Sequence, residues 1–460
     1  MSILVLNFKI SFNRGKRLSQ WKKVKIGDFL TGRTGRYKPN DPTISKYQRL
    51  DKINFSGTIH LSTKPTKTDM ILVQPGDLVI SGINVAKGAV SVYQGTEPIC
   101  ATIHYSAYTF NEKIVDLDFF RLFVKSPAFI EALKRQVKGG IKTEIKPKHL
   151  LPLEISIPDL SEQKRIVATV SNSLKQAEDL QKEIDSQKEY VKLLRQNILQ
   201  DAIEGKLTAD WRKSHPVIKG NPDYDAEALF EKIQKEKASD KKQKQLSQIT
   251  DEEKTFEIPE GWKWVRLGEI IKEPPRNGYS PKAVDFETPI KTLKLGAVTY
   301  GIFDPNEYKY INEEIPKDAY CWLKNGDFLI ERSNSVEYVG ICAIYTGKDN
   351  EFMYPDLLMR FKTQDILSKQ YIHTALISPF NRSYFMNSAK GAQKTMPKIN
   401  QDCVVNTMIP LPPLKEQEEI VIQVEKHLQT VSELESQITE REQLAKKLMQ
   451  SILKDAFEER

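Results

Sequence analysis

The sequence predicts an α+β protein with a pseudo-two-fold internal repeat. We expect two β-rich α/β domains, separated by two long helices that pair as an antiparallel coiled coil. Three observations lead to this prediction. The chain has 460 residues, enough for two to four domains of roughly 100–200 residues each. Two segments repeat with identical length, and each carries an apolar residue at every seventh position.

The repeat is clearest in two patches that recur at a constant offset of 254 residues. Residues 157–167 (IPDLSEQKRIV) match residues 411–421 (LPPLKEQEEIV) at six of eleven positions. Residues 194–204 (LRQNILQDAIE) match residues 448–458 (LMQSILKDAFE) at seven of eleven. Because both patches share one offset, the segments between them have equal length, which indicates a duplicated unit.

Upstream of these patches the similarity is weaker and its offset drifts. Residues 21–27 resemble 262–268, residues 75–80 resemble 325–330, and residues 138–143 resemble 390–395. The drift indicates insertions, so the two upstream domains have diverged. Short β-forming runs bounded by Gly, Pro and Asn predict strands, and two longer patches predict helices. The strands are expected at 70–73, 78–80, 90–93 and 328–330, and the helices at 126–137 and 368–386.

The segments of fixed length read as long helices with a seven-residue seam. About 44 residues give a rod of roughly 66 Å, and Gly205 follows the first helix where glycine commonly ends one. A helix packed on its own domain is the alternative; the matching length and phase favour pairing of the two helices. The helix-pairing residues are Val170, Ala177, Ile184, Val191 and Ile198 in the first copy, and Val424, Val431, Ile438, Ala445 and Ile452 in the second.

These patterns divide the chain into six segments. They are an N-terminal arm (1–20), a first domain (21–157), a first spacer helix (158–206), a charge-mixed linker (207–258), a second domain (259–409) and a second spacer helix (410–460).

Composition excludes several classes of protein. The four cysteines (Cys100, Cys321, Cys342 and Cys403) are far apart, which argues against a disulfide scaffold and a Cys-type zinc site. The apolar start of the chain is too short for a convincing signal peptide. No run approaches the roughly 18 apolar residues that cross a bilayer. We therefore expect a soluble protein of the cytoplasm.

Positive charge gathers in the domains. The chain carries 69 Lys and Arg against 61 Asp and Glu, a net charge of +8. Residues 21–150 hold 21 basic against 11 acidic residues, and residues 262–410 hold 19 against 17. The first helix (161–205) holds 7 against 8. A polyanion such as nucleic acid would therefore meet the domains rather than the helices.

Basic and amide residues cluster in three loops of each domain, at matched places in the two copies. Any single cluster could be a solvated face, and the recurrence favours a binding role. Arg, Asn and Gln can make two hydrogen bonds to a base edge, while Lys suits phosphates. The candidate DNA-binding residues are Arg33, Arg36, Lys38, Asn84, Lys87, Lys138, Lys142 and Lys146 in the first domain, and Arg276, Asn277, Arg332, Ser333, Asn334, Lys390, Gln393, Lys394 and Lys398 in the second.

The sequence contains no complete catalytic motif of the kinds described next. Residues 221–224 (NPDY) are similar to the N-P-P-Y loop of amino-methyltransferases, but the second proline is missing and no glycine-rich cofactor loop precedes them. We interpret them as a turn. There is no G-x-x-x-x-G-K-[ST] loop, and the six histidines show no metal-ligand spacing. We expect no catalytic residue, metal site or cofactor in this chain.

The ordered, duplicated set of motifs resembles the specificity subunit of Type I restriction–modification systems over most of the chain. It comprises the Leu/Ile-Pro…Glu-Gln motifs at 157–163 and 411–417, the Gly-Asp pairs at 76–77 and 326–327, the Lys-Gly loops at 138 and 390, and the sequence GKLTADWR at 205–212.

The resemblance implies a non-catalytic subunit with two target-recognition domains. Each would read one half of a split, asymmetric site in double-stranded DNA, and the helix pair would set the spacer. Two methyltransferase subunits and restriction (motor) subunits would dock on the chain and would carry S-adenosylmethionine, ATP and Mg²⁺. Two alternatives remain. A self-contained restriction or modification enzyme would need a cofactor loop, and a coiled-coil scaffold unrelated to DNA would not need basic loops in both domains.

Overall fold

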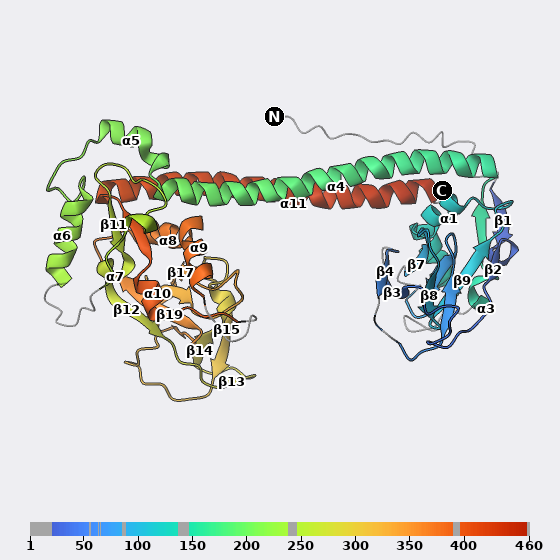
Figure 1. Cartoon of the computed structure of the whole chain (residues 1–460), viewed down its shortest axis with the longest axis horizontal. Coiled ribbons are helices and arrows are strands. Elements are labelled where there is room, and N and C mark those ends of the chain that lie inside the picture. The colour runs from blue at the N-terminus through green and yellow to red at the C-terminus, as the bar shows by residue number, and fades with distance from the viewer. Residues whose placement is uncertain are drawn as a thin grey trace. The chain divides into compact units, whose positions relative to one another are not determined.

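The structure, a computed structural model, describes residues 21–457 except 55–56, 63, 65, 85–88, 137–146, 238–245 and 390–395. The chain forms two compact units. The first comprises Met1–Ser186 with Ile438–Arg460, and the second comprises Gln187–Gln437. Each unit joins one β-rich domain to a part of each long helix, so the segments of the first unit lie at opposite ends of the sequence (Figure 1).

The first domain contains two four-stranded sheets and a separate strand pair. One sheet has the order β2 (Leu30–Gly32), β9 (Tyr105–Phe110), β6 (Leu78–Ser81) and β7 (Val90–Val92). The other has the order β4 (Ile59–Ser62), β3 (Arg49–Ile53), β8 (Ile99–Thr102) and β5 (Met70–Val73). The strand pair, β1 (Lys22–Lys25) with β10 (Glu154–Ile157), closes the domain by joining its two ends.

The second domain repeats this topology. Its first sheet has the order β12 (Ile271–Asn277), β19 (Leu358–Thr363), β16 (Phe328–Glu331) and β17 (Cys342–Ile344). Its second sheet has the order β13 (Ala283–Val284), β15 (Tyr308–Ile311), β14 (Ile290–Leu293) and β18 (Phe352–Met353). Strand β11 (Lys263–Arg266) pairs with β20 (Met408–Leu411). The parallel pair β3·β8 corresponds to β14·β18. The copies differ in one strand, since β5 adds to β8 in the first domain and β13 adds to β15 in the second.

Short helices complete each domain. They are α1 (Leu117–Phe123), α2 (Pro127–Gln136) and α3 (Pro147–Leu150) in the first, and α7 (Leu267–Ile270), α8 (Lys369–Ile377), α9 (Pro379–Ser388) and α10 (Gln401–Val405) in the second. The sequence predicted one helix over 368–386, and the structure divides it into α8 and α9. Pro379 occupies the first turn of α9 and the Ser378 side chain caps it, so the first helix ends there.

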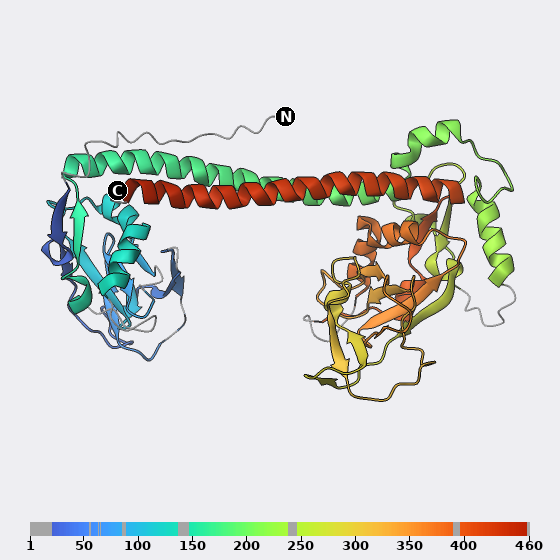
Figure 2. The ribbon, with the colours of Figure 1, turned by 180° about the vertical axis from the view of Figure 1, so that it is seen from behind.

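The two long helices are α4 (Leu160–Ile203) and α11 (Leu414–Phe457), of 44 residues each. All ten predicted seam residues are at most 8% exposed. In the first unit, Ile166 and Val170 share a core with Ile452 and Phe457. In the second, Ile203 shares a core with Ile420 and Val424. The start of one helix therefore packs on the end of the other, and within each unit they run side by side and antiparallel (Figures 1 and 2). The predicted fold class is confirmed.

The first unit has an aromatic core that includes the end of α11. Phe119, Phe120, Phe123 and Phe129 are at most 4% exposed. The ring of Phe457 lies edge-on to Phe119 and Phe123, with centroids 5.4 and 5.6 Å apart. Edge-to-face pairs of this kind add to the burial of apolar area. Residues from both ends of the sequence thus build one core.

The segment predicted as a linker (207–258) is an ordered part of the second unit over its described residues. It contains α5 (Ala209–Ser214) and α6 (Ala226–Lys237). Ala226, Leu229 and Ile233, spaced three and four apart on α6, are fully buried in the core of the second domain. The high density of charge in this segment hid this narrow apolar face.

No helix among the described residues is long and apolar enough to cross a membrane. In the same part of the chain, no group of three or more His, Cys, Asp or Glu side chains is arranged to hold a metal ion.

Candidate DNA-recognition surface

The repeated Gly-Asp motif forms a turn that starts the central strand of each first sheet. Gly76 and Gly326 both have φ of +85°, a conformation that favours glycine. The buried carboxylates of Asp77 and Asp327 accept hydrogen bonds from the backbone N–H of Gln74 and Lys324, each at 2.8 Å. The motif therefore has a structural role, and the loops that follow β6 and β16 differ in sequence between the two copies.

Each buried aspartate is matched by basic side chains. Arg33, a predicted DNA contact, donates through Nε to Asp77. In the second domain, Arg360 and Lys362 approach Asp327 at 3.4 and 3.5 Å. Burial raises the pKa of the Asp327 carboxyl despite these cations. Part of the positive charge that the sequence assigned to DNA binding is thus neutralised inside the domains.

In the second domain, the loops after β12 and β16 meet the segment before α10. The backbone N–H of Arg332 donates to Leu357 O at 2.8 Å, and that of Gly278 donates to Leu358 O at 3.2 Å. Ser333 forms an isolated bridge with Lys398. The structure therefore brings together six predicted residues, from the end of β12, the loop after β16 and the segment before α10: Arg276, Asn277, Arg332, Ser333, Asn334 and Lys398. Arg276 and Asn277, which the sequence placed in a loop, are the last two residues of the strand.

Three of these six face inward. The amide of Asn334 donates to Glu331 at 2.6 Å and its oxygen accepts from the backbone N–H of Ser335 at 2.8 Å. Ser333 is fully buried. The side-chain oxygens of Ser333 and Asn277 are buried without a hydrogen-bond partner among the described residues. These residues shape the loop, which leaves Arg276, Arg332 and Lys398 as its accessible cations.

The carboxylate that orders this loop is Glu331. It is fully buried and accepts hydrogen bonds from Thr299 Oγ1 at 2.7 Å and from Asn334. Burial raises the pKa of the Glu331 carboxyl, and the two hydrogen bonds oppose that shift. The network ties the loop after β16 to the turn at residues 299–303.

In the first domain, the candidate DNA-binding residues that the structure describes are more dispersed than those of the second domain. Arg36 and Lys38 lie on the exposed segment after β2, and Lys38 Nζ contacts Asp69 at 3.0 Å. Asn84 lies in the turn that follows β6. The remaining candidates lie outside the described residues: Lys87, Lys138, Lys142, Lys146, Lys390, Gln393 and Lys394.

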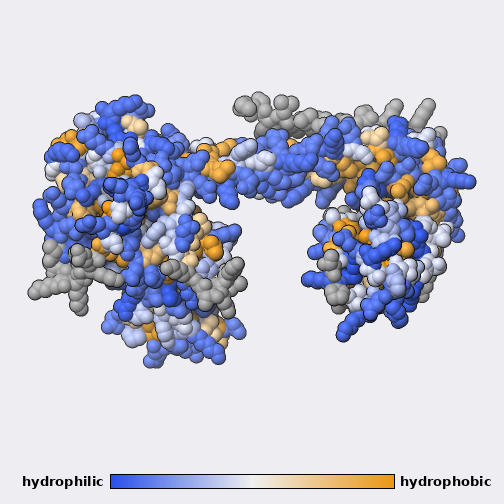
Figure 3. Space-filling model, viewed as in Figure 1, coloured by the Kyte–Doolittle hydropathy of each residue, from blue (hydrophilic) through white to orange (hydrophobic). Residues whose placement is uncertain are grey.

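Sequence reasoning missed the aromatic residues of this surface. The guanidinium of Arg276 lies 3.5 Å from the centroid of the Tyr320 ring. Tyr279, Tyr300 and Tyr320 are 41%, 82% and 38% exposed. Tyrosines interleaved with basic residues are a signal for nucleic-acid contact, and Tyr279, three residues after Arg276, could have been found by it. On the face seen in Figure 3, hydrophilic residues cover most of both domains.

The repeated Glu-Gln motif joins each long helix to its domain. The buried Gln163 donates to Pro158 O at 2.8 Å and accepts from the backbone N–H of Asp116 at 2.7 Å. Gln417 makes the matching bonds, to Pro412 O at 2.9 Å and from Ser368 N at 3.0 Å. The motif therefore fixes the start of each long helix to its domain.

The glutamate of the second copy has a further role. Glu416 is 2% exposed. Its carboxylate accepts from Thr208 Oγ1 at 2.7 Å, from Arg212 Nη1, and from Trp262 Nε1 at 2.7 Å. The GKLTADWR motif thus supplies two donors to a buried acid at the start of α11.

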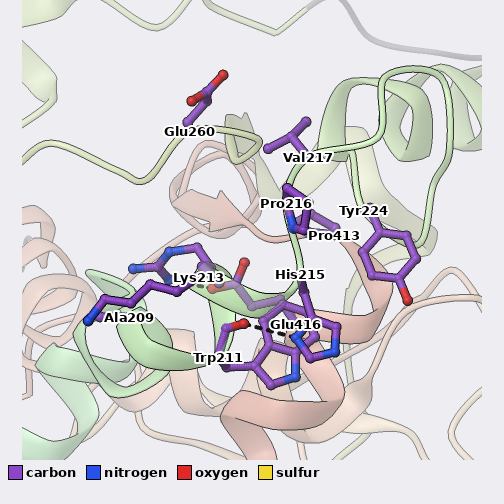
Figure 4. Close-up of a pocket in the computed structure, with 11 residues that line it drawn as sticks. Ala209, Trp211, Lys213, His215, Pro216, Val217, Tyr224, Glu260, Pro413 and Glu416 are labelled. Carbon is purple, nitrogen blue, oxygen red and sulfur yellow. Dashed lines mark hydrogen bonds and ion pairs between the residues drawn. The ribbon is translucent and has the colours of Figure 1, made fainter.

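Beside this network lies a cavity of about 480 Å³. The rings of Trp211 and His215 stack at 4.1 Å between centroids, and Tyr224 lies parallel to His215 at 6.4 Å (Figure 4). The predicted turn at residues 221–224 is confirmed. The carbonyls of Pro222 and Asp223 accept from the first two N–H groups of α11, which satisfies donors that a helix start leaves unpaired.

Comparison with known proteins gives consistent matches. A family model described as the Type I restriction modification DNA specificity domain matches residues 19–189 and 259–442. The EcoKI specificity subunit of Escherichia coli (strain K12) is 27% identical over 390 residues, which cover 84% of this chain and 75% of that protein. The EcoEI specificity subunit of Escherichia coli is 29% identical over 262 residues, covering 54% of this chain and 42% of that protein.

A solved structure, described as concerning the assembly and conformational transition of the type I R-M system, contains a chain with the same fold. Its TM-score is 0.65 at 18% identity, covering 95% of this chain and 97% of that chain. The family model matches the two copies of the repeat separately, and each match contains one β-rich domain and the first part of the long helix that follows it. The chain therefore belongs to the Type I restriction modification DNA specificity domain family.

Proposed function

We propose that this chain is the DNA sequence-recognition subunit of a type I restriction–modification complex. Each β-rich domain reads one half of a split, asymmetric site in double-stranded DNA. The observation that carries the proposal is the duplicated domain: both copies have the same strand order in the first sheet, the same buried Gly-Asp turn, and a basic loop after the equivalent strand.

The two helices set the spacer between the half-sites in this proposal. Their equal length of 44 residues and continuous apolar seam support it. A regular helix of this length spans roughly 66 Å. A paired rod resists bending better than a single helix, because its seam buries apolar area along the whole length.

The chemistry belongs to partner subunits. Two methyltransferase subunits carry S-adenosylmethionine, and restriction (motor) subunits carry ATP and Mg²⁺. This chain contributes the sequence readout and a docking frame, and it supplies no catalytic residue.

Recognition by separate domains is tested in the assembled complex. The full chain is co-expressed with methyltransferase subunits, and methylated adenines are mapped across the genome. Arg332→Ala should relax the preference at one half-site only, because its side chain belongs to the second domain. Each lost bidentate contact costs about 1–3 kcal/mol of discrimination.

The matched control is Lys219→Ala, an exposed cation on the loop before α6. It should leave the methylated site unchanged. Equal weakening of both half-sites by Arg332→Ala would contradict one domain per half-site. Methylation without any defined sequence would contradict the proposed function itself.

A further inference from the structure

The guanidinium of Arg276 stands apart from most other arginines of the described structure. Arg33, Arg212, Arg266 and Arg360 all form ion pairs with carboxylates. For Arg276, the contact found among the described residues is the face of Tyr320, 3.5 Å from ring centroid to Cζ. Its five N–H donors therefore remain for a ligand, although the group itself is held in place.

We propose that Arg276 reads a guanine in the half-site bound by the second domain, and that Tyr320 is the positioning residue that fixes its guanidinium. This inference rests on the proposed function and adds to it a base, a reading residue and the residue that orients it.

The backbone on both sides of Arg276 is fixed. Its carbonyl accepts from the hydroxyl of Tyr354 at 3.3 Å. Two residues later, a Cβ on Gly278 would lie 2.0 Å from Tyr354 O, so only glycine allows this close crossing. The N–H of Tyr279 donates to Tyr354 O at 3.0 Å. The strand end that carries Arg276 therefore cannot shift along its neighbour.

The backbone segment that carries Tyr320 is anchored as well. The next residue, Cys321, is 2% exposed, and Leu323 is fully buried in the core. Trp322 Nε1 donates to Pro316 O at 2.8 Å, which closes the segment into a loop. A ring carried by an anchored segment and stacked on an anchored strand end orients the guanidinium plane, and a stacked guanidinium keeps its N–H edges free.

A guanidinium edge matches one base in the major groove. Guanine presents O6 and N7 side by side as acceptors, and arginine bound to both is the commonest specific contact. A phosphate would also attract Arg276, but phosphate contacts do not distinguish sequences and need no fixed plane. The fixed plane therefore favours a base over the backbone.

The test uses the assembled complex with the full chain, after its methylated site has been mapped. Each guanine of the second half-site is replaced in turn by 7-deazaguanine, which lacks the N7 acceptor, and Kd is measured by competition at one salt concentration. The unmodified protein should lose affinity several-fold at one guanine. Arg276→Ala should bind both duplexes equally at that position and should lose about 5- to 150-fold of its preference for guanine over adenine.

The positioning role is tested by Tyr320→Leu, which keeps apolar bulk without a π face. It should lower the guanine preference about two- to fivefold, and Tyr320→Phe should restore it. Tyr190→Leu makes the same substitution at a tyrosine that is 70% exposed on α4, outside both β-rich domains, and should change nothing. Unaltered preferences at the other positions of the half-site would show that each variant is folded.

Three outcomes would overturn the inference. The first is a second half-site that contains no guanine. The second is that Arg276→Ala weakens binding to all sequences equally and lowers the salt dependence of log K by about one. The third is that Tyr320→Leu leaves the preference for guanine unchanged. Each of them leaves a defined split site in place. The absence of such a site would instead refute the proposed function.

Discussion

The buried carboxylate of Glu416, at the start of α11, allows a quantitative prediction. Arg212→Ala removes the one cation among the described residues that contacts Glu416, and leaves its carboxylate with the neutral donors Thr208 and Trp262. Breaking a buried ion pair by removing one partner costs about 3–5 kcal/mol, because the remaining charge stays buried. The Arg212 side chain is 23% exposed, so water can reach part of the vacated space. We therefore expect the lower end, about 3 kcal/mol.

The loss of stability should be confined to this junction, because the hydrogen bonds of Glu416 join the GKLTADWR segment to the first turn of α11. The N–H groups of Leu414 and Lys415 donate to carbonyls of the adjoining turn at 3.1 and 3.2 Å, and their hydrogen exchange reports its opening. A change of about 3 kcal/mol corresponds to about 10²-fold faster exchange.

The control lies one residue away on the same helix. Lys213 pairs with Asp210, and their side chains are 78% and 93% exposed. Exposed pairs contribute less than about 1 kcal/mol, so Lys213→Ala should accelerate exchange by no more than about fivefold. Unchanged exchange in Arg212→Ala, or an equal rise in both variants, would refute the argument that the buried network closes this junction.

The helices and the loop network lead to five further predictions. Gly205→Ala should lower the melting temperature, because φ is +72° and a Cβ would lie 2.5 Å from Pro259 Cγ. A decrease in the free energy of unfolding of less than about 1 kcal/mol would contradict this strain. A chain truncated after Trp211 should form a homodimer through α4, with an interrupted palindrome as its site. Ile203→Phe should tighten that dimer in sedimentation, because residue 203 replaces Phe457 at the aromatic core; looser association would oppose this packing. Inserting one heptad in each helix should lengthen the DNA spacer by at most about three base pairs in the methylation map, whereas an unchanged spacer would remove the helices from this role. The raised pKa of Glu331 means that its carboxyl stabilises the fold most at low pH and less as pH rises through that pKa. Glu331→Gln should therefore gain melting temperature relative to the parent as pH rises from 4.5, the ordinary glutamate value, through the raised pKa, and a constant difference would argue against the burial effect.

The architecture could be predicted because it leaves periodic and duplicated signals in the chain. Seam residues such as Val170 and Val424 recur every seven positions, and one face of the helix must be apolar to pair. The linker was predicted, but the docking of α6 into the core was not, because three apolar residues are enough to dock a short helix among many charges. Periodicity cannot reveal such a narrow face.

The candidate site was predicted at the level of loops rather than of side chains. The loop after β16 was found from its composition, but the composition does not tell which residue faces inward. Asn334 hydrogen-bonds Glu331, whose equivalent in the first copy is Ser81. Comparison of the two copies therefore could not show that Asn334 faces inward. The partner of Arg276 is 44 residues away in the sequence, and a pair brought together by tertiary structure leaves no local pattern.

The shared aromatic core of the first unit has a consequence for how the protein is made. Strand β10 ends at residue 157, yet Phe457, which packs on Phe119 and Phe123, is translated 300 residues later. At roughly 5–20 residues per second, the nascent first domain waits about 15–60 s for this side chain. During that time its phenylalanine surface is open to chaperones, or to the equivalent apolar face of α4. Translation speed and chaperone supply should therefore influence the yield of native protein more than the stability of the finished fold suggests.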